Sequence, residues 1–259
     1  MAFYQEKFED RIYLKSDKLN PVHGFTTRLG GVSTGLITGF NFGFRVNDNP
    51  DSVCENYRLM SCDLGVDLSK TVLSKQTHTD NIRIVTKDDW GKGIVKTSDI
   101  SDTDALVTNI KGTALTVFSA DCTPILLYDK ENRVIAAIHS GWRGTVKNIS
   151  AKCVKLMREA FGSNPKNIIA AIGPCIGPCC FEFGPDAVDY FDKAYLKPTE
   201  NGKYIVDIQS IISDSLLSCG LLSDNIDISD ICTVCHSDMF YSYRKHKNKT
   251  GRQIAIIML

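Results

Sequence analysis

Four short runs of apolar, largely β-branched residues follow one another in the middle of the chain, and they constrain its fold most strongly. The runs cover residues 106–107, 115–118, 125–128 and 134–138. Short apolar runs separated by turn residues are typical of buried strands. Glu131 and Asn132 lie between the last two runs. We expect a hairpin turn there, although the pair lacks the glycine that such turns favour.

A helix is predicted soon after these strands. A glycine-rich turn follows His139, and a stripe of apolar residues at helical spacing then runs from about 146 to 161, where Gly162 is a plausible stop. Residues 168–172 form the next apolar run. Strand, turn, helix and strand in this order predict a βαβ unit. We therefore expect an α/β fold with a mixed sheet, which some schemes would class as α+β.

Local signals predict further elements on both sides of this unit. Asn49 and Pro50 are a typical cap and first residue of a helix that would stop at Gly65. A second helix is expected over 208–219, and strands over 82–85 and 253–259. The many glycines of 24–35 indicate a folded loop with positive φ angles.

Composition limits the partners that the chain could have. Its 30 Lys and Arg balance its 30 Asp and Glu, so it lacks the basic character typical of nucleic-acid or anionic-membrane binding. No apolar run reaches the roughly 18 residues of a spanning helix, and the acidic, mixed start does not resemble a signal peptide. We expect one domain over residues 1–259, a cytoplasmic location, and ten cysteines that are reduced and mostly structural.

Three reactive residues lie at the ends of predicted elements. Cys122 and His139 each end an apolar run, and His78 follows the string 74–77. Such junctions are where α/β proteins build sites. Two imidazoles and a thiolate could bind zinc or copper with one position left open; alternatively, Cys122 could be a nucleophile and His139 its base. The long sequence separations permit both interpretations, and Pro124 is expected to break the strand beside Cys122.

Two stretches could bind an anion. Glycines flank Arg143 between a predicted strand and a helix N-terminus, where N–H groups and the guanidinium could hold phosphate. A surface arginine in a tight turn is the alternative. Tyr241, Tyr243 and Arg244 form a second stretch, which Arg252 follows, and it could hold an aromatic base and an anion or could simply be an exposed basic loop.

Two cysteine-rich strings resemble local metal motifs. They are 175–180 (CIGPCC) and 232–236 (CTVCH). A Cys-x-x-Cys half-site needs a second half, which Cys175, Cys179 and Cys180 could supply. We favour the simpler interpretation that these are buried thiols in a glycine-proline turn.

Taken together, several strings in order along the chain resemble the laccase-domain family of purine nucleoside phosphorylases, formerly called the multicopper polyphenol oxidase or YfiH-type family. The strings are 26–33 (TTRLGGVS), 41–43 (NFG), 75–78 (KQTH), 102–107 (DTDALV), 121–127 (DCTPILL), 139–144 (HSGWRG), 172–178 (IGPCIGP), 243–244 (YR) and 250–252 (TGR). The match runs nearly end to end and looks like a bacterial, single-domain member. It departs from many members at Thr79-Asp80, where they have Gly or Ser.

The resemblance implies layered mixed β-sheets with flanking helices, a fold shared with cytotoxic necrotizing factor toxins. It implies that His78, Cys122 and His139 bind a metal, usually Zn²⁺ with Cu²⁺ also possible. It further implies phosphorolysis of adenosine, inosine and S-methyl-5'-thioadenosine, giving free base and pentose 1-phosphate, together with deamination of adenosine. The partners would be purine nucleosides and phosphate, without nucleic acid or membrane, and the protein would be a monomer or weak homodimer.

We assign provisional roles on this basis. Cys122 and His139 are expected in catalysis, with Asp121 as a supporting or proton-transfer group. Arg143 is the candidate for phosphate, assisted by Arg45 or Arg244.

Gln76, in the string before His78, joins these arginines as a substrate-binding candidate. Two alternatives to the phosphorylase stay open. One is a metal-free Cys–His hydrolase or amidase acting in peptidoglycan-precursor editing; the other is a non-enzymatic metal-binding or redox-sensing protein. Copper-dependent phenol oxidation is disfavoured, because five histidines are too few for a set of copper centres.

Overall fold

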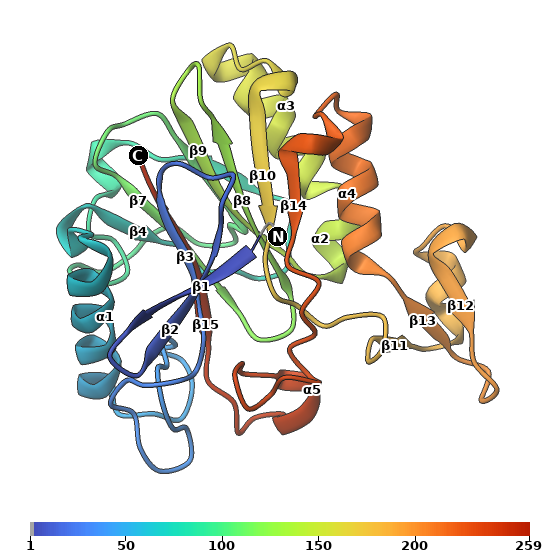
Figure 1. Ribbon diagram of the computed structural model, residues 1–259, viewed down its shortest axis with the longest axis horizontal. Helices are drawn as coiled ribbons and strands as arrows, with labels where there is room; N and C mark the ends of the chain where they lie inside the picture. The colour runs from blue at the N-terminus through green and yellow to red at the C-terminus, as the bar shows by residue number, and fades with distance from the viewer. Residues whose placement is uncertain (1–2) are drawn as a thin grey trace.

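Two mixed six-stranded sheets pack face to face between helices, so that the fold has four layers (Figure 1). The computed structural model describes residues 3–259; Met1 and Ala2, part of the start in which no signal peptide was expected, lie outside this range. The architecture confirms the layered mixed sheets with flanking helices that the sequence predicted. Within the described range, no helix combines the length and apolar character needed to cross a bilayer.

The first sheet has the order β1-β2-β3-β15-β7-β4, and only β4 and β7 are parallel neighbours. Its strands are β1 (Phe3–Phe8), β2 (Arg11–Ser16), β3 (Val22–Thr26), β4 (Thr71–Leu73), β7 (Ala114–Ser119) and β15 (Gln253–Met258). The C-terminal strand β15 is therefore central to the sheet, between β3 and β7.

The second sheet has the order β14-β10-β8-β9-β6-β5. Its strands are β5 (Ile82–Ile84), β6 (Ala105–Thr108), β8 (Thr123–Asp129), β9 (Val134–Ser140), β10 (Ile168–Ile172) and β14 (Ile226–Ile228). The middle strands bury both faces, which explains why their sequences are continuous apolar runs without alternation.

Alternate residues along the strands of the second sheet belong to two different hydrophobic cores, one on each face of the sheet. On the second sheet, Leu106 and Leu126 pack against the first sheet, whereas Val107 and Ile125 pack against helices. The helices on that side are α2 (Trp142–Val146), α3 (Ile149–Phe161) and α4 (Ile208–Ser218), and α1 (Pro50–Leu64) covers the outer face of the first sheet. A small sheet of β11 (Glu182–Phe183), β12 (Leu196–Pro198) and β13 (Tyr204–Val206) projects from the body (Figure 1), and α5 (Tyr243–His246) lies in the expected basic loop.

The predicted βαβ unit and helix caps are confirmed. β9 and β10 are parallel, with β8 antiparallel to both between them, and α3 makes the crossover. The side chain of Asn49 accepts from the N–H of Asp51, and Gly65 ends α1 with φ 65°. The expected hairpin joins β8 and β9, where Arg133 takes the positive φ in place of glycine.

Three expectations about local structure were wrong. The helix expected from about 146 to 161 begins only at Ile149, as α3, because Asn148 adopts a left-handed φ of 57° that separates it from the short helix α2. Pro124 does not break the strand: it is the second residue of β8, beyond the last residue pair that β8 forms with β10, so its missing N–H leaves the ladder intact. Gly24 lies within β3, while Gly30 and Gly31 do have the expected positive φ.

Candidate metal centre and its cleft

His78, Cys122 and His139 converge, although they are far apart in the sequence. His78 lies in the loop between β4 and β5, Cys122 in the turn between β7 and β8, and His139 near the end of β9. One ligand atom from each residue lies within 4.8 Å of the others, and Cys122 Sγ is 3.6 Å from His78 Nε2. Tetrahedral zinc bonds would separate a nitrogen and a sulfur ligand by about 3.6 Å. The three side chains therefore fit one metal ion.

Asp104, the residue just before β6, positions both histidines. Its Oδ1 accepts from Nδ1 of His139 at 2.7 Å and from the backbone N–H of His78 at 3.0 Å. Its Oδ2 accepts from the backbone N–H and hydroxyl of Thr79, both at 2.8 Å. The carboxylate is fully buried and engages Nδ1 of His139, which leaves Nε2 free to bind a metal, as in many metal sites.

Gly141 is the residue that allows this close approach. A Cβ at this position would lie 2.7 Å from Cδ2 of His78 and 3.2 Å from Sγ of Cys122. Since real Cβ atoms do not approach carbon so closely, any larger residue would displace the imidazole. The turn after His139 thus provides space for the donor atoms.

Cys122 and His139 perturb each other's protonation. Burial alone would raise the pKa of the Cys122 thiol, but the two imidazoles, His139 above all, lower it to about 6. Burial would lower the pKa of His139, but the Cys122 thiolate and the Asp104 carboxylate raise it to about 9. Burial likewise opposes ionisation of Asp104, and its partners His139 and Thr79 nonetheless lower its pKa to about 2. A thiolate is therefore present at neutral pH, as metal ligation and nucleophilic attack both require.

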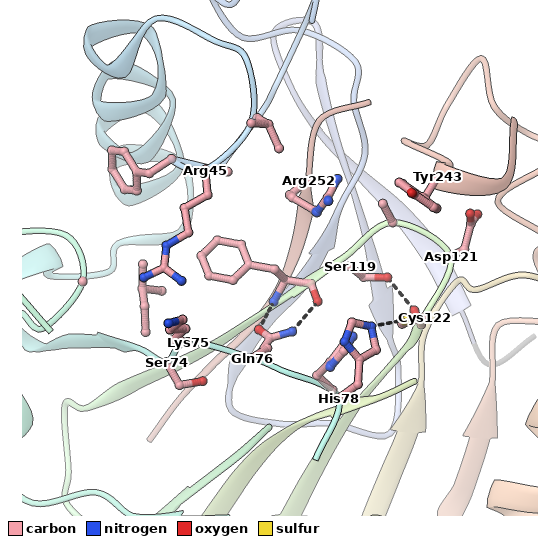
Figure 2. Close-up of a pocket in the computed structure, with 18 of the residues that line it drawn as sticks. Arg45, Ser74, Lys75, Gln76, His78, Ser119, Asp121, Cys122, Tyr243 and Arg252 are labelled. Atoms are coloured by element: carbon pink, nitrogen blue, oxygen red, sulfur yellow. Dashed lines mark hydrogen bonds between the residues drawn. The ribbon is translucent and has the colours of Figure 1, made fainter. Parts of the chain in front are cut away.

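A cleft of about 1470 Å³ opens onto these residues (Figure 2). It exceeds the roughly 300–1,000 Å³ typical of small-molecule pockets, so a nucleoside and a phosphate could occupy it together. Its lining includes the aromatic side chains Phe44, Phe118, Trp142, Phe181 and Tyr243. It also includes six Lys or Arg residues but only two Asp, which favours an anionic ligand.

Comparison with known proteins agrees with this architecture. The family model described as "Multi-copper polyphenol oxidoreductase laccase" matches residues 22–259. The chain belongs to this laccase family. This chain is 33% identical to purine nucleoside phosphorylase YlmD of Bacillus subtilis, over 91% of this chain and 87% of that protein.

Two other relatives of the laccase-family chain are informative. Adenosine deaminase RL5, from an unknown prokaryotic organism, is 31% identical over 89% of this chain and 91% of its own length. The crystal structure of a Bacillus licheniformis protein called YfiH superposes with a TM-score of 0.93 at 29% identity, covering 100% of this chain and 99% of that one. The fold of the laccase family therefore extends along the chain.

Two of the residues that the sequence predicted for this site, Gln76 and Asp121, form hydrogen bonds within the protein that hold its loops in place. Gln76 lines the cleft, but its amide pairs with the backbone of Phe118, donating to the carbonyl at 2.9 Å and accepting from the N–H at 2.7 Å (Figure 2). Asp121 is mostly buried, and its carboxylate accepts from the Thr233 hydroxyl at 2.7 Å and the Arg244 N–H at 2.6 Å. It is Asp104, and not Asp121, that contacts the histidines.

Of the three arginines predicted to bind phosphate, two lie in the cleft and one lies on the outer surface. Arg45 and Arg244 line the cleft, but Arg143 is exposed and stacks on the neighbouring Trp142 ring, with 4.2 Å between its guanidinium carbon and the ring centroid. Arg244 donates to the backbone carbonyls of Cys180 and Glu182. Arg252, which the sequence placed near a possible anion, also lines the cleft (Figure 2).

The sequence did not indicate that Asp104 or Gly141 lies beside the candidate metal ligands; Gly141 was predicted only as part of an anion-binding turn. Both lie in strings that carried the family resemblance, DTDALV and HSGWRG. An acidic residue immediately before a buried strand was the available signal for Asp104.

Proposed function

We propose that this protein is a zinc-dependent purine nucleoside phosphorylase that also deaminates adenosine. The observation that carries the proposal is the convergence of His78, Cys122 and His139 on a large cationic cleft. The names of the relatives, a purine nucleoside phosphorylase and an adenosine deaminase, supply the two reactions. The substrates would be adenosine, inosine and S-methyl-5'-thioadenosine, with phosphate as the second substrate in phosphorolysis.

The metal would be held by the two imidazoles and the thiolate, with zinc as the first choice and copper as the second. When bound, it supplies a Lewis acid that polarises water or a substrate oxygen. Asp104 keeps the ring of His139 in one tautomer, with Nδ1 protonated, and thereby presents Nε2 as the ligand atom. Asp121 contributes indirectly, by fixing the turn that carries Cys122.

Phosphate would bind to the cations of the cleft. Arg45 is exposed on the cleft lining and forms no ion pair with any residue of the described range 3–259, so its guanidinium is available for two parallel hydrogen bonds. Arg252 and Arg244 supply further positive charge on the same lining. The geometry favours Arg45 and Arg252 over Arg143, which lies outside the cleft.

The purine would lie against the aromatic part of the lining. Phe118 and Tyr243 line the same cleft as the histidine and cysteine side chains, and aromatic stacking is a common way to hold a base. Gln76 would help by fixing the backbone of Phe118 through its two hydrogen bonds.

The decisive experiment measures product release from adenosine and inosine with and without phosphate. We expect phosphate-dependent release of free base and pentose 1-phosphate, and conversion of adenosine to inosine without phosphate. Cys122→Ala should abolish both activities and remove metal from this site, whereas the control Cys54→Ala, an exposed cysteine on α1, should not. If Cys122→Ala kept both its turnover and the metal held by His78 and His139, the proposal would be refuted.

A metal-free cysteine hydrolase is the second candidate. Asp104 contacts His139, whose ring lies within 4.8 Å of the Cys122 thiol, so the three could act as acid, base and nucleophile, and the thiol is ionised near neutral pH. This candidate predicts an amidase activity that iodoacetamide abolishes and chelators leave intact. Loss of activity with a chelator and its recovery with zinc would exclude it.

A further inference from the structure

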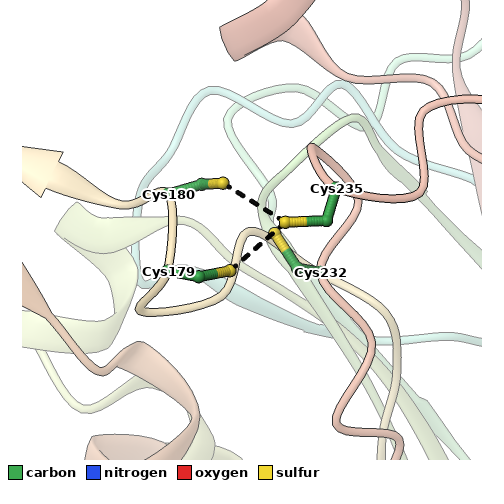
Figure 3. A group of neighbouring side chains, drawn as sticks. All are labelled: Cys179, Cys180, Cys232 and Cys235. Carbon is green, nitrogen blue, oxygen red and sulfur yellow. Dashed lines mark hydrogen bonds between the residues drawn. The ribbon is translucent and has the colours of Figure 1, made fainter.

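A second group of metal-ligating side chains lies outside the catalytic site. The sulfur atoms of Cys179, Cys180, Cys232 and Cys235 all lie within 4.8 Å of one another (Figure 3). These residues come from the two strings in which the sequence favoured simple buried thiols. Cys175 is indeed buried, but Cys179 and Cys235 are exposed, so burial in a core does not explain the group.

The spacing of the sulfur atoms matches metal ligation. Sγ of Cys235 is 3.5 Å from Sγ of Cys179 and 3.5 Å from Sγ of Cys180. Four thiolates around one zinc ion, each at about 2.3 Å, would lie about 3.8 Å apart. A disulfide would instead need two of the sulfurs at about 2.05 Å.

Backbone contacts join the two halves of the group. Cys175 and Cys232 form an isolated parallel bridge, in which the N–H of Thr233 donates to the carbonyl of Cys175 at 2.9 Å. Within the half that carries Cys179 and Cys180, the N–H of Phe181 donates to the carbonyl of Gly177 at 2.9 Å and closes the turn. The two loops are therefore fixed next to each other by contacts other than the sulfurs.

Two donors near the group would stabilise negative charge on it. The N–H of Gly177 donates to Sγ of Cys232 at 3.3 Å. The guanidinium of Arg244 donates to the backbone carbonyl of Cys180 at 3.2 Å, which brings a positive charge close to a group that would carry net negative charge with zinc bound. Gly177 keeps the two loops close, because a Cβ there would lie 3.2 Å from Cβ of Cys232, a tight contact.

We propose that Cys179, Cys180, Cys232 and Cys235 form a structural zinc site with four thiolate ligands, distinct from the site of His78, Cys122 and His139. Four protein ligands leave no open position, which is typical of a structural zinc. The ion would join the loop 175–182 to the loop 231–236.

This second zinc would stabilise one wall of the cleft. Thr233, next to Cys232, donates to the carboxylate of Asp121, which also accepts from the N–H of Arg244. Asp121 directly precedes Cys122. Loss of the second zinc is therefore expected to loosen the turn that carries Cys122, without removing any ligand of the first metal.

Zinc analysis of the purified, reduced full-length protein tests the proposal. We expect two zinc ions per chain in the wild type and the loss of one in Cys235→Ser and in Cys179→Ser. The matched control Cys62→Ser, an exposed cysteine of α1, should keep both. Unchanged zinc content in Cys235→Ser and Cys179→Ser, or a disulfide within the group in protein purified without reductant, would overturn the proposal.

A second measurement keeps all four cysteines, so that its result does not depend on whether the serine variants fold. Cys122→Ala removes the thiolate of the first site, so X-ray absorption at the zinc edge should then report coordination dominated by sulfur, at about 2.3 Å. Coordination by nitrogen and oxygen alone, or no zinc, would refute the second site. Because this readout needs no turnover, it fails or succeeds independently of the proposed nucleoside chemistry.

Discussion

Nδ1 of His139 donates to Oδ1 of Asp104 at 2.7 Å, and the same carboxylate receives the backbone N–H groups of the loop that carries His78. One buried charge thus sets the orientation of one histidine ring and the path of the backbone at the other. His78 has a positive φ of 64°, a conformation unusual for a side chain of this size, and its N–H bond to Asp104 helps to hold it there. The donor atoms are therefore prearranged before any ion binds.

Removing the charge of Asp104 should weaken metal binding. In Asp104→Asn, the amide NH₂ must face donors on at least one side, so the ring of His139 and the His78 loop lose their common anchor. We expect zinc affinity at the first site to fall by about 10- to 100-fold, measured by competition with a chelator. Asp102→Asn, which alters an exposed carboxylate two residues away, is the control and should change affinity little. Equal effects of the two substitutions would argue against the role of Asp104.

Alkylation of Cys122 in metal-free protein should follow an unusually low pKa. The thiolate, which reacts with iodoacetamide, is lost as the pH falls through about 6. His139→Gln removes the facing cation and should move this midpoint to higher pH, as peptide-resolved mass spectrometry would record. A midpoint that stays near pH 6 in His139→Gln would contradict the assigned cause.

The same pair should give the metal-free protein a window of extra stability. Cys122 is a thiolate above about pH 6 and His139 an imidazolium below about pH 9, so the two groups are both charged, and attract each other, only between these values. Thermal unfolding of chelator-treated protein should show the largest difference between wild type and His139→Gln between these two values.

Arg45→Ala should mainly affect phosphate. A charge-assisted hydrogen bond contributes about 1.5–3 kcal/mol, so we expect the KM for phosphate to rise by roughly 10- to 100-fold while the KM for nucleoside changes less. Arg143→Ala, in the exposed turn, is the comparison and should leave both unchanged. A larger effect of Arg143→Ala would instead support the anion site that the sequence predicted after His139.

Gly141→Ala should disturb the first metal site without unfolding the protein. The added Cβ would lie 2.7 Å from the ring of His78, which is exposed and can move away. We expect lower zinc content at this site and a nearly unchanged Tm in chelator-treated protein. Full zinc occupancy in Gly141→Ala would show that the close approach is not required.

Asp89 should stabilise the segment that leads into residues 93–101, which line one side of the cleft. Its buried carboxylate accepts from Arg83 at 2.7 Å and Lys92 at 2.9 Å. Burial opposes its charge, but these partners lower its pKa from 3.8 to about 2, which corresponds to about 2 kcal/mol of stability. Because the pKa is lowered, this contribution is present at neutral pH and lost between pH 4 and 2.

Urea unfolding of Asp89→Asn measures this contribution. We expect the free energy of unfolding to fall by about 2 kcal/mol at pH 7 and the difference from wild type to shrink at pH 3. Asp99→Asn is the control, because Asp99 contacts the same Lys92 from an exposed position and such pairs contribute about 0–1 kcal/mol. A difference that grows as the pH falls would contradict the assigned pKa.

Sequence patterns located the candidate ligands but not their neighbours. Cys122 and His139 were recognisable because each ends an apolar run, and His78 because of the string around it. Arg143 was chosen on its local turn, yet the short helix α2 directs it onto Trp142 and away from the cleft. A local turn signal says nothing about the direction of a side chain in the assembled fold.

Fold prediction failed where local signals were weak. β1 and β2 form a hairpin whose first strand has no buried residue and carries two charges, so no apolar run marked it. β11, β12 and β13 are two or three residues long. By contrast, Asn49, Pro50 and Gly65 marked α1 well, because caps act through neighbouring backbone groups.

The sequence alone determined the buried strands, the ends of α1 and the candidate ligands of the first metal site, because these depend on apolar runs, on capping chemistry and on strings that resemble a known family. The tertiary structure decided which residues meet. Only the packing of two sheets places Asp104 between two histidine-bearing segments, Arg252 in the cleft, and Cys179 and Cys180 beside Cys232 and Cys235. Each of these contacts joins residues tens to hundreds of positions apart, and such contacts form when the layers pack together, not within any local segment.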